Sequence, residues 1–197
     1  MTGSTLNMHY TIADPKTFGI SEYEPVLPIY HSDQPEDSKE HCSDLLHRLD
    51  RIDPDRLSPE NAYTYRLLHR SLENDLALAD FPYYNEPLSP SSGMQSQLPV
   101  LLAEYTFRTK RDVTDYLALL DQIDDYFASL LLYEQEKAAA GFFMPACSSE
   151  KVRKQCDTIV TTEELAQGTH FLQTTFEDRL SELQKQGLFP PEETASL

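Results

Sequence analysis

The sequence contains few glycines and few cysteines, and these shortages exclude several kinds of active site. Its 197 residues include six glycines, and none of them lies in a G-x-S-x-G, G-x-G-x-x-G or Walker A pattern. The three cysteines lie 105 and 9 residues apart, so the C-x-x-C spacing of a zinc knuckle is absent. A nucleophile elbow, a glycine-rich nucleotide loop and a zinc knuckle are therefore excluded from this chain.

Histidine spacing removes another common metal site. No two of the six histidines are four residues apart, so the chain has no H-E-x-x-H motif. That motif places two imidazoles on one helical face, where they bind zinc together. We therefore expect no catalytic residue, no metal ligand and no cofactor in this chain.

Basic residues are scarce as well. Lys and Arg number 16 against 33 Asp and Glu, which gives a net charge of −17. A strongly acidic chain is a poor partner for nucleic-acid phosphates or for an anionic membrane surface. Apolar runs such as 130–133 are much shorter than the roughly 20 residues of a membrane-spanning helix. We expect neither nucleic acid nor a membrane as a partner.

The first residues and the cysteine content bear on localisation. Residues 1–10 contain neither a basic stretch nor an apolar run of the secretory type. An odd, small number of cysteines is typical of proteins that keep free thiols in a reducing compartment. These features predict a cytoplasmic protein.

Residues 1–35 differ in pattern from the rest of the chain. Apolar side chains alternate at Leu6, Met8, Tyr10 and Ile12, which is typical of a half-buried strand. Three prolines between residues 25 and 35 then favour an irregular or extended backbone. We therefore predict an extended N-terminal segment, 1–35, with a short β element. Only weak partner strands follow, so a pairing partner outside this chain is one alternative.

From residue 36 onward, hydrophobic side chains recur at helical spacing, as at Cys42, Leu45 and Leu49. Thr109 and Asp112 have the spacing of a capping box at a helix start. The sequence therefore predicts a mainly α fold, an antiparallel helical bundle-like domain over 36–197. Its helices are expected at about 36–53, 59–81, 96–107, 110–140, 149–161 and 169–186.

The loop at 82–95 is the best candidate for binding a ligand. It is rich in proline, and loops of this length within a domain are often functional. A loop packed as its own unit over a helical core is the open alternative. The residues that we expect to line a substrate cleft are Tyr83, Tyr84, Ser89, Ser92, Gln95 and Gln97, together with His9.

At this loop the chain resembles a known bacterial family. From Tyr83 to Tyr105 it is similar to domain-of-unknown-function family 885. The resemblance covers most of residues 5–160. Further similar strings lie at 9–15, 18–20, 112–113, 115–120, 126–127 and 137–144.

The resemblance implies a function that the chain's own motifs do not show. Members of that family resemble zincin-type zinc metallopeptidases, which are mostly helical and carry an H-E-x-x-H-like motif in the C-terminal half. This chain would then be an N-terminal portion and a wall or lid of a peptide cleft, inactive alone. Zinc, a peptide substrate and the missing C-terminal catalytic half would belong to the complete protein. The alternative is a stand-alone acidic helical interaction module without enzymatic activity.

Overall fold

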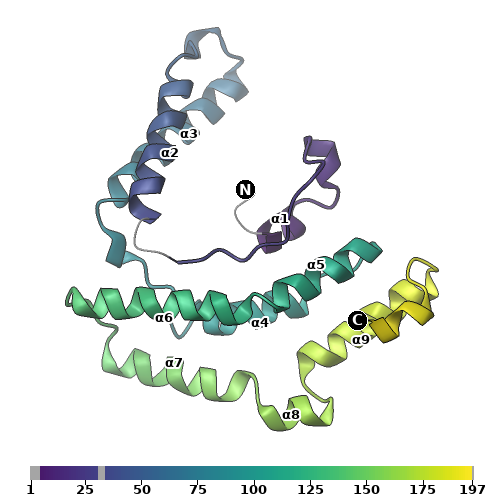
Figure 1. Cartoon of the computed structure of the whole chain (residues 1–197). Helices are drawn as coiled ribbons and strands as arrows, with labels where there is room; N and C mark the ends of the chain where they lie inside the picture. The colour runs from purple at the N-terminus through teal and green to yellow at the C-terminus, as the bar shows by residue number, and fades with distance from the viewer. Residues whose placement is uncertain (1–4, 31–33, 197) are drawn as a thin grey trace. The chain divides into compact units, whose positions relative to one another are not determined.

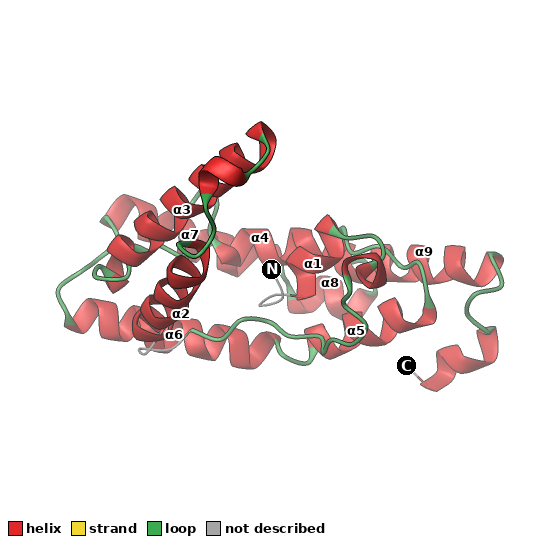
Figure 2. Cartoon of the chain, turned by 90° about the horizontal axis from the view of Figure 1, so that it is seen from above, coloured by secondary structure: helices red, strands yellow, loops and turns green. Residues whose placement is uncertain are grey.

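The computed structural model describes residues 5–30 and 34–196, which form helices joined by turns and loops (Figures 1 and 2). This part of the chain contains no β-strand, so the mainly α prediction is confirmed. None of its helices combines the length and the apolar character that crossing a membrane requires. The helices are α1 (Thr5–Thr11), α2 (Gln34–Leu49), α3 (Pro59–Leu78), α4 (Met94–Ala103), α5 (Lys110–Leu120), α6 (Ile123–Ala139), α7 (Ala146–Ile159), α8 (Thr162–Gln167) and α9 (Phe171–Lys185).

The chain divides into two compact units. Unit 1 comprises Met1–Ile29, Pro87–Leu131 and Phe143–Leu197, and unit 2 comprises Tyr30–Glu86 and Leu132–Phe142. These units do not coincide with the division at residue 35. The division into an N-terminal segment, 1–35, and a helical domain, 36–197, stays a prediction.

The expected N-terminal β element is wrong, because Thr5–Thr11 forms the helix α1. Its buried positions 6, 9 and 12 are three apart, and 8 and 12 are four apart, so they share one helical face. The apolar alternation was misleading, because it placed Tyr10 on the buried face and His9 on the opposite one. In the structure His9 is buried and Tyr10 is 39% exposed. The Tyr10 hydroxyl donates a hydrogen bond to the Leu101 carbonyl, which ties α1 to α4.

Unit 1 is built around α4, α5 and α9. Helix α4 packs against α7 and α9, as contacts between these elements show. A second part of the core lies between α5 and α9, where aromatic rings stack on aliphatic side chains. Its members are Phe107, Val113, Phe176, Leu180, Leu183 and Phe189.

Unit 2 is a helical pair, because α2 and α3 pack against each other (Figure 1). Ser58 caps α3 by accepting a hydrogen bond from the Asn61 backbone N–H, with Pro59 in the first helical position. The small core of the pair consists of Cys42, Leu49 and Leu72, with Leu45, Leu46, Tyr65 and Leu76 packed against it.

The helix expected over 110–140 is interrupted at residues 121 and 122, between α5 and α6. At this interruption Gln122 clamps the N-terminal segment. Its amide Nε2 donates to the carbonyls of Pro25 at 2.8 Å and Ala118 at 2.7 Å, and its Oε1 accepts the Leu27 N–H at 3.0 Å. The bonds to Pro25 and Leu27 satisfy backbone groups of residues 20–30, which form neither a helix nor a strand.

Replacing Gln122 with alanine should therefore destabilise unit 1 by about 1–3 kcal/mol, because Pro25 and Leu27 lose their hydrogen-bond partners. Urea unfolding followed by circular dichroism measures the change. The matched control is Gln167→Ala, at an exposed position on α8 in unit 1, which should leave the free energy of unfolding nearly unchanged. Equal stabilities of the two variants would contradict the clamp.

Candidate functional site

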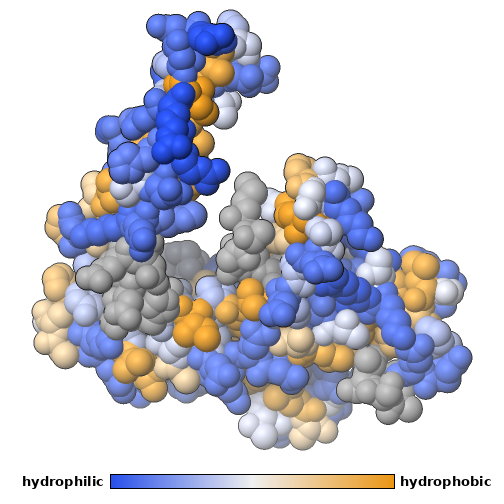
Figure 3. All heavy atoms as spheres, turned by 45° about the horizontal axis from the view of Figure 1, so that its top comes forward, coloured by the Kyte–Doolittle hydropathy of each residue, from blue (hydrophilic) through white to orange (hydrophobic). Residues whose placement is uncertain are grey.

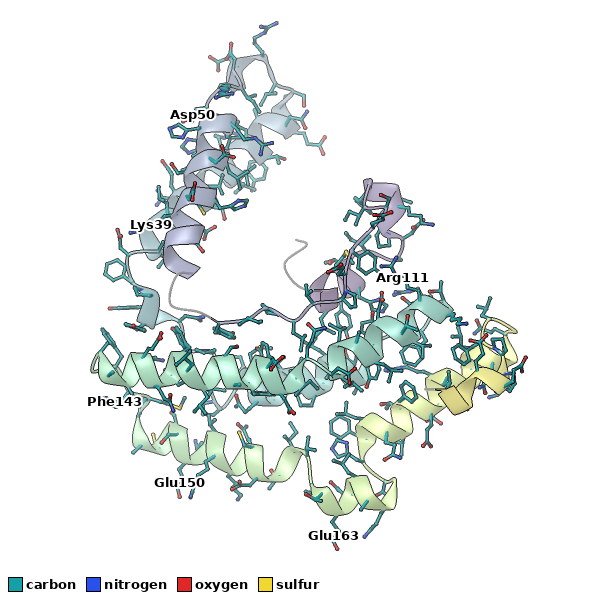
Figure 4. All side chains as sticks on the ribbon, in the orientation of Figure 1. Lys39, Asp50, Arg111, Phe143, Glu150 and Glu163 are labelled. Atoms are coloured by element: carbon teal, nitrogen blue, oxygen red, sulfur yellow. The ribbon has the colours of Figure 1, made fainter. Side chains whose placement is uncertain are left out.

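Unit 1 contains a cavity of about 580 Å³ beside α1, which we call the His9 cavity. Small-molecule sites in proteins have volumes of about 300–1,000 Å³, so this cavity is of a suitable size. Figure 4 shows Arg111 on α5, directed toward the N-terminal segment. The polar residues that line the cavity are His9, Asp14, Lys16, Ser21, Tyr23, Arg108, Thr109, Arg111 and Asp112.

His9 lies at the centre of this polar network. Its Nε2 lies 3.3 Å from the backbone nitrogen of Thr106 and 3.3 Å from a guanidinium nitrogen of Arg108. Neither of these groups can accept a hydrogen bond, so Nε2 must be the acceptor and the proton lies on Nδ1. Nδ1 is 3.7 Å from Oδ1 of Asp112.

The surroundings keep His9 neutral. Burial lowers its pKa below the ordinary 6.5, and the Arg108 guanidinium adds to this, while the Asp112 carboxylate acts in the opposite direction. The ring also stacks on Tyr105, with ring centroids 3.7 Å apart and planes 10° from parallel. A neutral imidazole with its proton on Nδ1 is the form that these contacts favour.

Asp112 anchors the start of α5, as the predicted capping box requires. Its Oδ2 accepts hydrogen bonds from the backbone N–H groups of Arg108 at 2.9 Å and Thr109 at 2.7 Å, and from the Thr109 hydroxyl at 3.0 Å. Thr109 Oγ1 in turn accepts the Asp112 N–H, so the capping box is confirmed. The carboxylate is therefore fixed in place with only Oδ1 directed at His9.

Arg111 and Arg108 differ in how their charge is used. The Arg111 Nε donates to Oδ2 of Asp115 at 3.3 Å, and a terminal nitrogen donates to the Tyr23 carbonyl at 2.6 Å. Its guanidinium also lies 4.2 Å from the centre of the Tyr23 ring. Arg108, by contrast, forms no ion pair with any described carboxylate, and neither does Lys16.

One buried polar atom behind the cavity has no partner. Tyr105 is fully buried, and its hydroxyl forms no hydrogen bond within the described residues. Burial raises the pKa of this hydroxyl, and the nearby Asp112 and Asp115 carboxylates raise it further, so the group is a neutral phenol.

The loop candidates Ser89, Ser92 and Gln95 do lie together. The Ser89 hydroxyl lies 3.2 Å from that of Ser92 and accepts the Ser92 N–H. Gln95 is only 3% exposed, and its Nε2 donates to the Ser89 carbonyl at 2.7 Å and to Oε1 of Gln155 at 2.9 Å. Gln155 also donates to the Pro90 carbonyl, so the loop is fastened to α7. These contacts are the ones expected of a loop that packs as its own unit over the helical core.

The other candidates lie elsewhere. Gln97 is exposed on α4. Tyr83 and Tyr84 belong to unit 2, where the Tyr83 ring contacts Phe142 and the 76% exposed Tyr84 borders a separate cavity of about 640 Å³. His9 is thus the one predicted cleft residue that lines the His9 cavity, and Lys16, Tyr23 and Arg108 were missed. The sequence gives little indication of them, because they lie in segments almost 100 residues apart.

Comparison with known proteins identifies the family. The profile of a bacterial protein family of unknown function, DUF885, matches residues 16–193. The chain belongs to DUF885. The match extends beyond residue 160, where the resemblance noted from the sequence ended, and it begins at residue 16, so His9 lies outside it. No curated protein and no solved structure matches the chain.

The residues that the structure describes do not fit a zinc site of the kind that the family resemblance assigns to the complete protein. Within 5–30 and 34–196, no three His, Cys, Asp or Glu side chains converge as metal ligands would. Zinc in proteins is held by three or four such ligands at about 2.0–2.3 Å. We therefore derive no metal-dependent step from this DUF885 chain.

The depressed pKa of His9 predicts a pH-dependent stability. Below the unfolded-state pKa, near 6.5, the unfolded chain binds a proton that folded His9 resists, so the free energy of unfolding should fall as the pH falls through this range. Urea unfolding at about pH 7.5 and about pH 5.5 measures this loss. His9→Gln keeps an acceptor for Arg108 but cannot titrate, so it should lose less stability. Equal losses in both proteins would contradict the assignment.

Gly93 allows the loop to close on Gln95. A Cβ at this position would overlap Oε1 of Gln95 and the backbone nitrogen of Ser89, although its φ of −72° suits any residue. Gly93→Ala should therefore cost about 1–3 kcal/mol in the free energy of unfolding through overpacking. Ser91→Ala, at an exposed position in the same loop, is the control and should be nearly neutral. Thermal unfolding compares the two variants, and a neutral Gly93→Ala would argue against the tight loop.

Proposed function

We propose that this chain is the N-terminal helical portion of a zinc-dependent peptidase and that it supplies part of the wall of the substrate cleft. The observation that carries the proposal is the His9 cavity, whose volume of about 580 Å³ suits a short stretch of peptide. The resemblance of the DUF885 family to zincin-type peptidases supplies the reaction class. In this proposal zinc comes from a part of the protein that this chain does not contain.

The residues of this chain would bind and orient the substrate. Arg108 and Lys16 can donate to substrate oxygens, and Ser21 adds a hydroxyl group. The exposed Gln97, which also belongs to unit 1, remains a candidate for contacts with the substrate. Holding a peptide in one geometry lowers the entropic cost of the reaction that follows. We include a cytoplasmic location in the proposal, because Cys42, Cys147 and Cys156 are all free thiols.

A second candidate function is a helical interaction module. It is favoured by large hydrophobic side chains that unit 2 leaves exposed on α3, namely Tyr63, Leu67, Leu68 and Leu78. Figure 3 shows hydrophobic atoms among the hydrophilic surface of the α2–α3 pair. Exposed apolar groups of this kind often mark a surface that another protein covers.

Zinc content and peptide hydrolysis distinguish the two functions. The protein from the complete reading frame that contains this sequence should bind zinc at 1:1 and cleave peptides, and a chelator should abolish cleavage. The 197-residue chain alone should do neither. Metal analysis and a peptide-library assay provide the measurements, with circular dichroism to establish that both proteins are folded. Tight 1:1 zinc in the short chain, or no hydrolysis by the complete protein, would reject the proposal.

A further inference from the structure

We propose that the His9 cavity binds a carboxylate group of a peptide ligand, with Arg108 as its main partner and Lys16 as the second. This inference rests on the proposed function only for the peptide nature of the ligand. The carboxylate preference follows from the charges and hydrogen bonds of the cavity itself.

Two cations that form no ion pair with any described carboxylate, Arg108 and Lys16, line the cavity in a chain whose net charge is −17. Lys16, Arg108 and Arg111 face the carboxylates of Asp14 and Asp112. Arg111 is already paired with Asp115, and three uncharged donors hydrogen-bond to Oδ2 of Asp112, which stabilises the Asp112 carboxylate without cancelling its charge. Arg108 and Lys16 are therefore the cations that a ligand can pair with, and a monoanion suits them better than a phosphate dianion, because Asp14 and Asp112 would repel a second negative charge.

Arg108 is positioned but not neutralised. Its backbone N–H is fixed by Asp112 at 2.9 Å, and one guanidinium nitrogen is held by Nε2 of His9 at 3.3 Å. A guanidinium has five N–H donors, so most of them remain for a ligand. The planar guanidinium fork matches the two oxygens of a carboxylate and binds them in parallel.

Neutral His9 is what keeps the Arg108 charge available. A carboxylate in its place would hold the guanidinium equally well but would form an ion pair, as Asp115 does with Arg111 at 3.3 Å. The imidazole instead offers only a lone pair, because Thr106 and Arg108 both donate to Nε2. The side chain of Arg108 therefore keeps its full charge beside the cavity.

Lys16 supplies the second cation. It lies in the short 3-10 helix Pro15–Phe18, which Asp14 caps by accepting the Lys16 backbone N–H at 3.1 Å. Its ammonium forms no ion pair with any described carboxylate. An ammonium is a point charge on a flexible stem, so it adds attraction without fixing the ligand's orientation.

The test measures peptide binding to the purified 197-residue chain by isothermal titration calorimetry. Three tripeptide probes are compared. The first has a free C-terminal carboxylate, the second is the same peptide with an amidated C-terminus, and the third is the amidated peptide with Glu as its central residue. We expect saturable binding of at least one acid-bearing probe and binding at least about tenfold weaker for the fully amidated one. The two acid probes distinguish a terminal carboxylate from a side-chain carboxylate.

Variants assign the effect to the cavity. Arg108→Gln should weaken acid binding about tenfold or more, and Arg108→Lys should not restore it fully, because the fork is lost. Arg153→Gln, at an exposed position on α7, should leave binding unchanged. Lys16→Glu reverses an exposed charge without touching the core, so it serves as the second variant if Arg108→Gln fails to fold.

Several outcomes overturn the inference. They are equal binding of the acid and amide probes, no saturable binding of either acid, and unchanged binding in Arg108→Gln or in Lys16→Glu. None of these results involves zinc or hydrolysis, so this inference can fail while the proposed function stands. Conversely, the 197-residue chain could bind acids selectively while the complete protein cleaves no peptide. That result would support the carboxylate site and reject the peptidase function.

Discussion

The hydrogen bonds of the Asp112 carboxylate determine the arrangement of unit 1 on which the cavity depends. One oxygen caps α5 through the Thr109 and Arg108 backbone and the Thr109 hydroxyl, and the other faces His9 on α1. A single side chain thus caps the 11-residue helix α5 and lies against His9 of the seven-residue helix α1, about 100 residues earlier. A helix as short as α1 is not stable alone, so its position depends on such tertiary contacts.

Burial of polar groups in this region has consequences for the chemistry of the cavity. A buried histidine and a buried carboxylate are costly unless they are hydrogen-bonded, and here each has its partners. The Tyr105 hydroxyl is the exception, and an unsatisfied group of this kind costs about 1–3 kcal/mol. Its ring stacks on His9 and helps to hold the imidazole in one orientation. A rigid imidazole in turn fixes the guanidinium of Arg108, which is the group that a ligand would meet.

Local signals in the sequence were sufficient for the helices but not for the cavity. Thr109 and Asp112 predicted the capping box, because the hydrogen bonds of that motif lie within four residues. Helix α1 was misread because the pattern treats histidine as polar and exposed, whereas contacts with Thr106, Arg108 and Tyr105 make the burial of His9 favourable. Gln122 likewise interrupts a strong helical pattern by binding Pro25 and Leu27, which no local rule indicates. Lys16, Tyr23 and Arg108 share the cavity only through the tertiary fold.

Net charge and local charge lead to different conclusions about ligands. A net charge of −17 argues against nucleic acid and anionic membranes, which present many charges over a large area. It does not argue against one carboxylate, because charges on an exposed surface are screened over about 8 Å at physiological salt. The cavity offers that carboxylate Arg108 and Lys16, which form no ion pair with any described carboxylate, and Asp14 and Asp112 line it as well. The acidic surface therefore still admits a small monoanionic group, but it disfavours a polyanion.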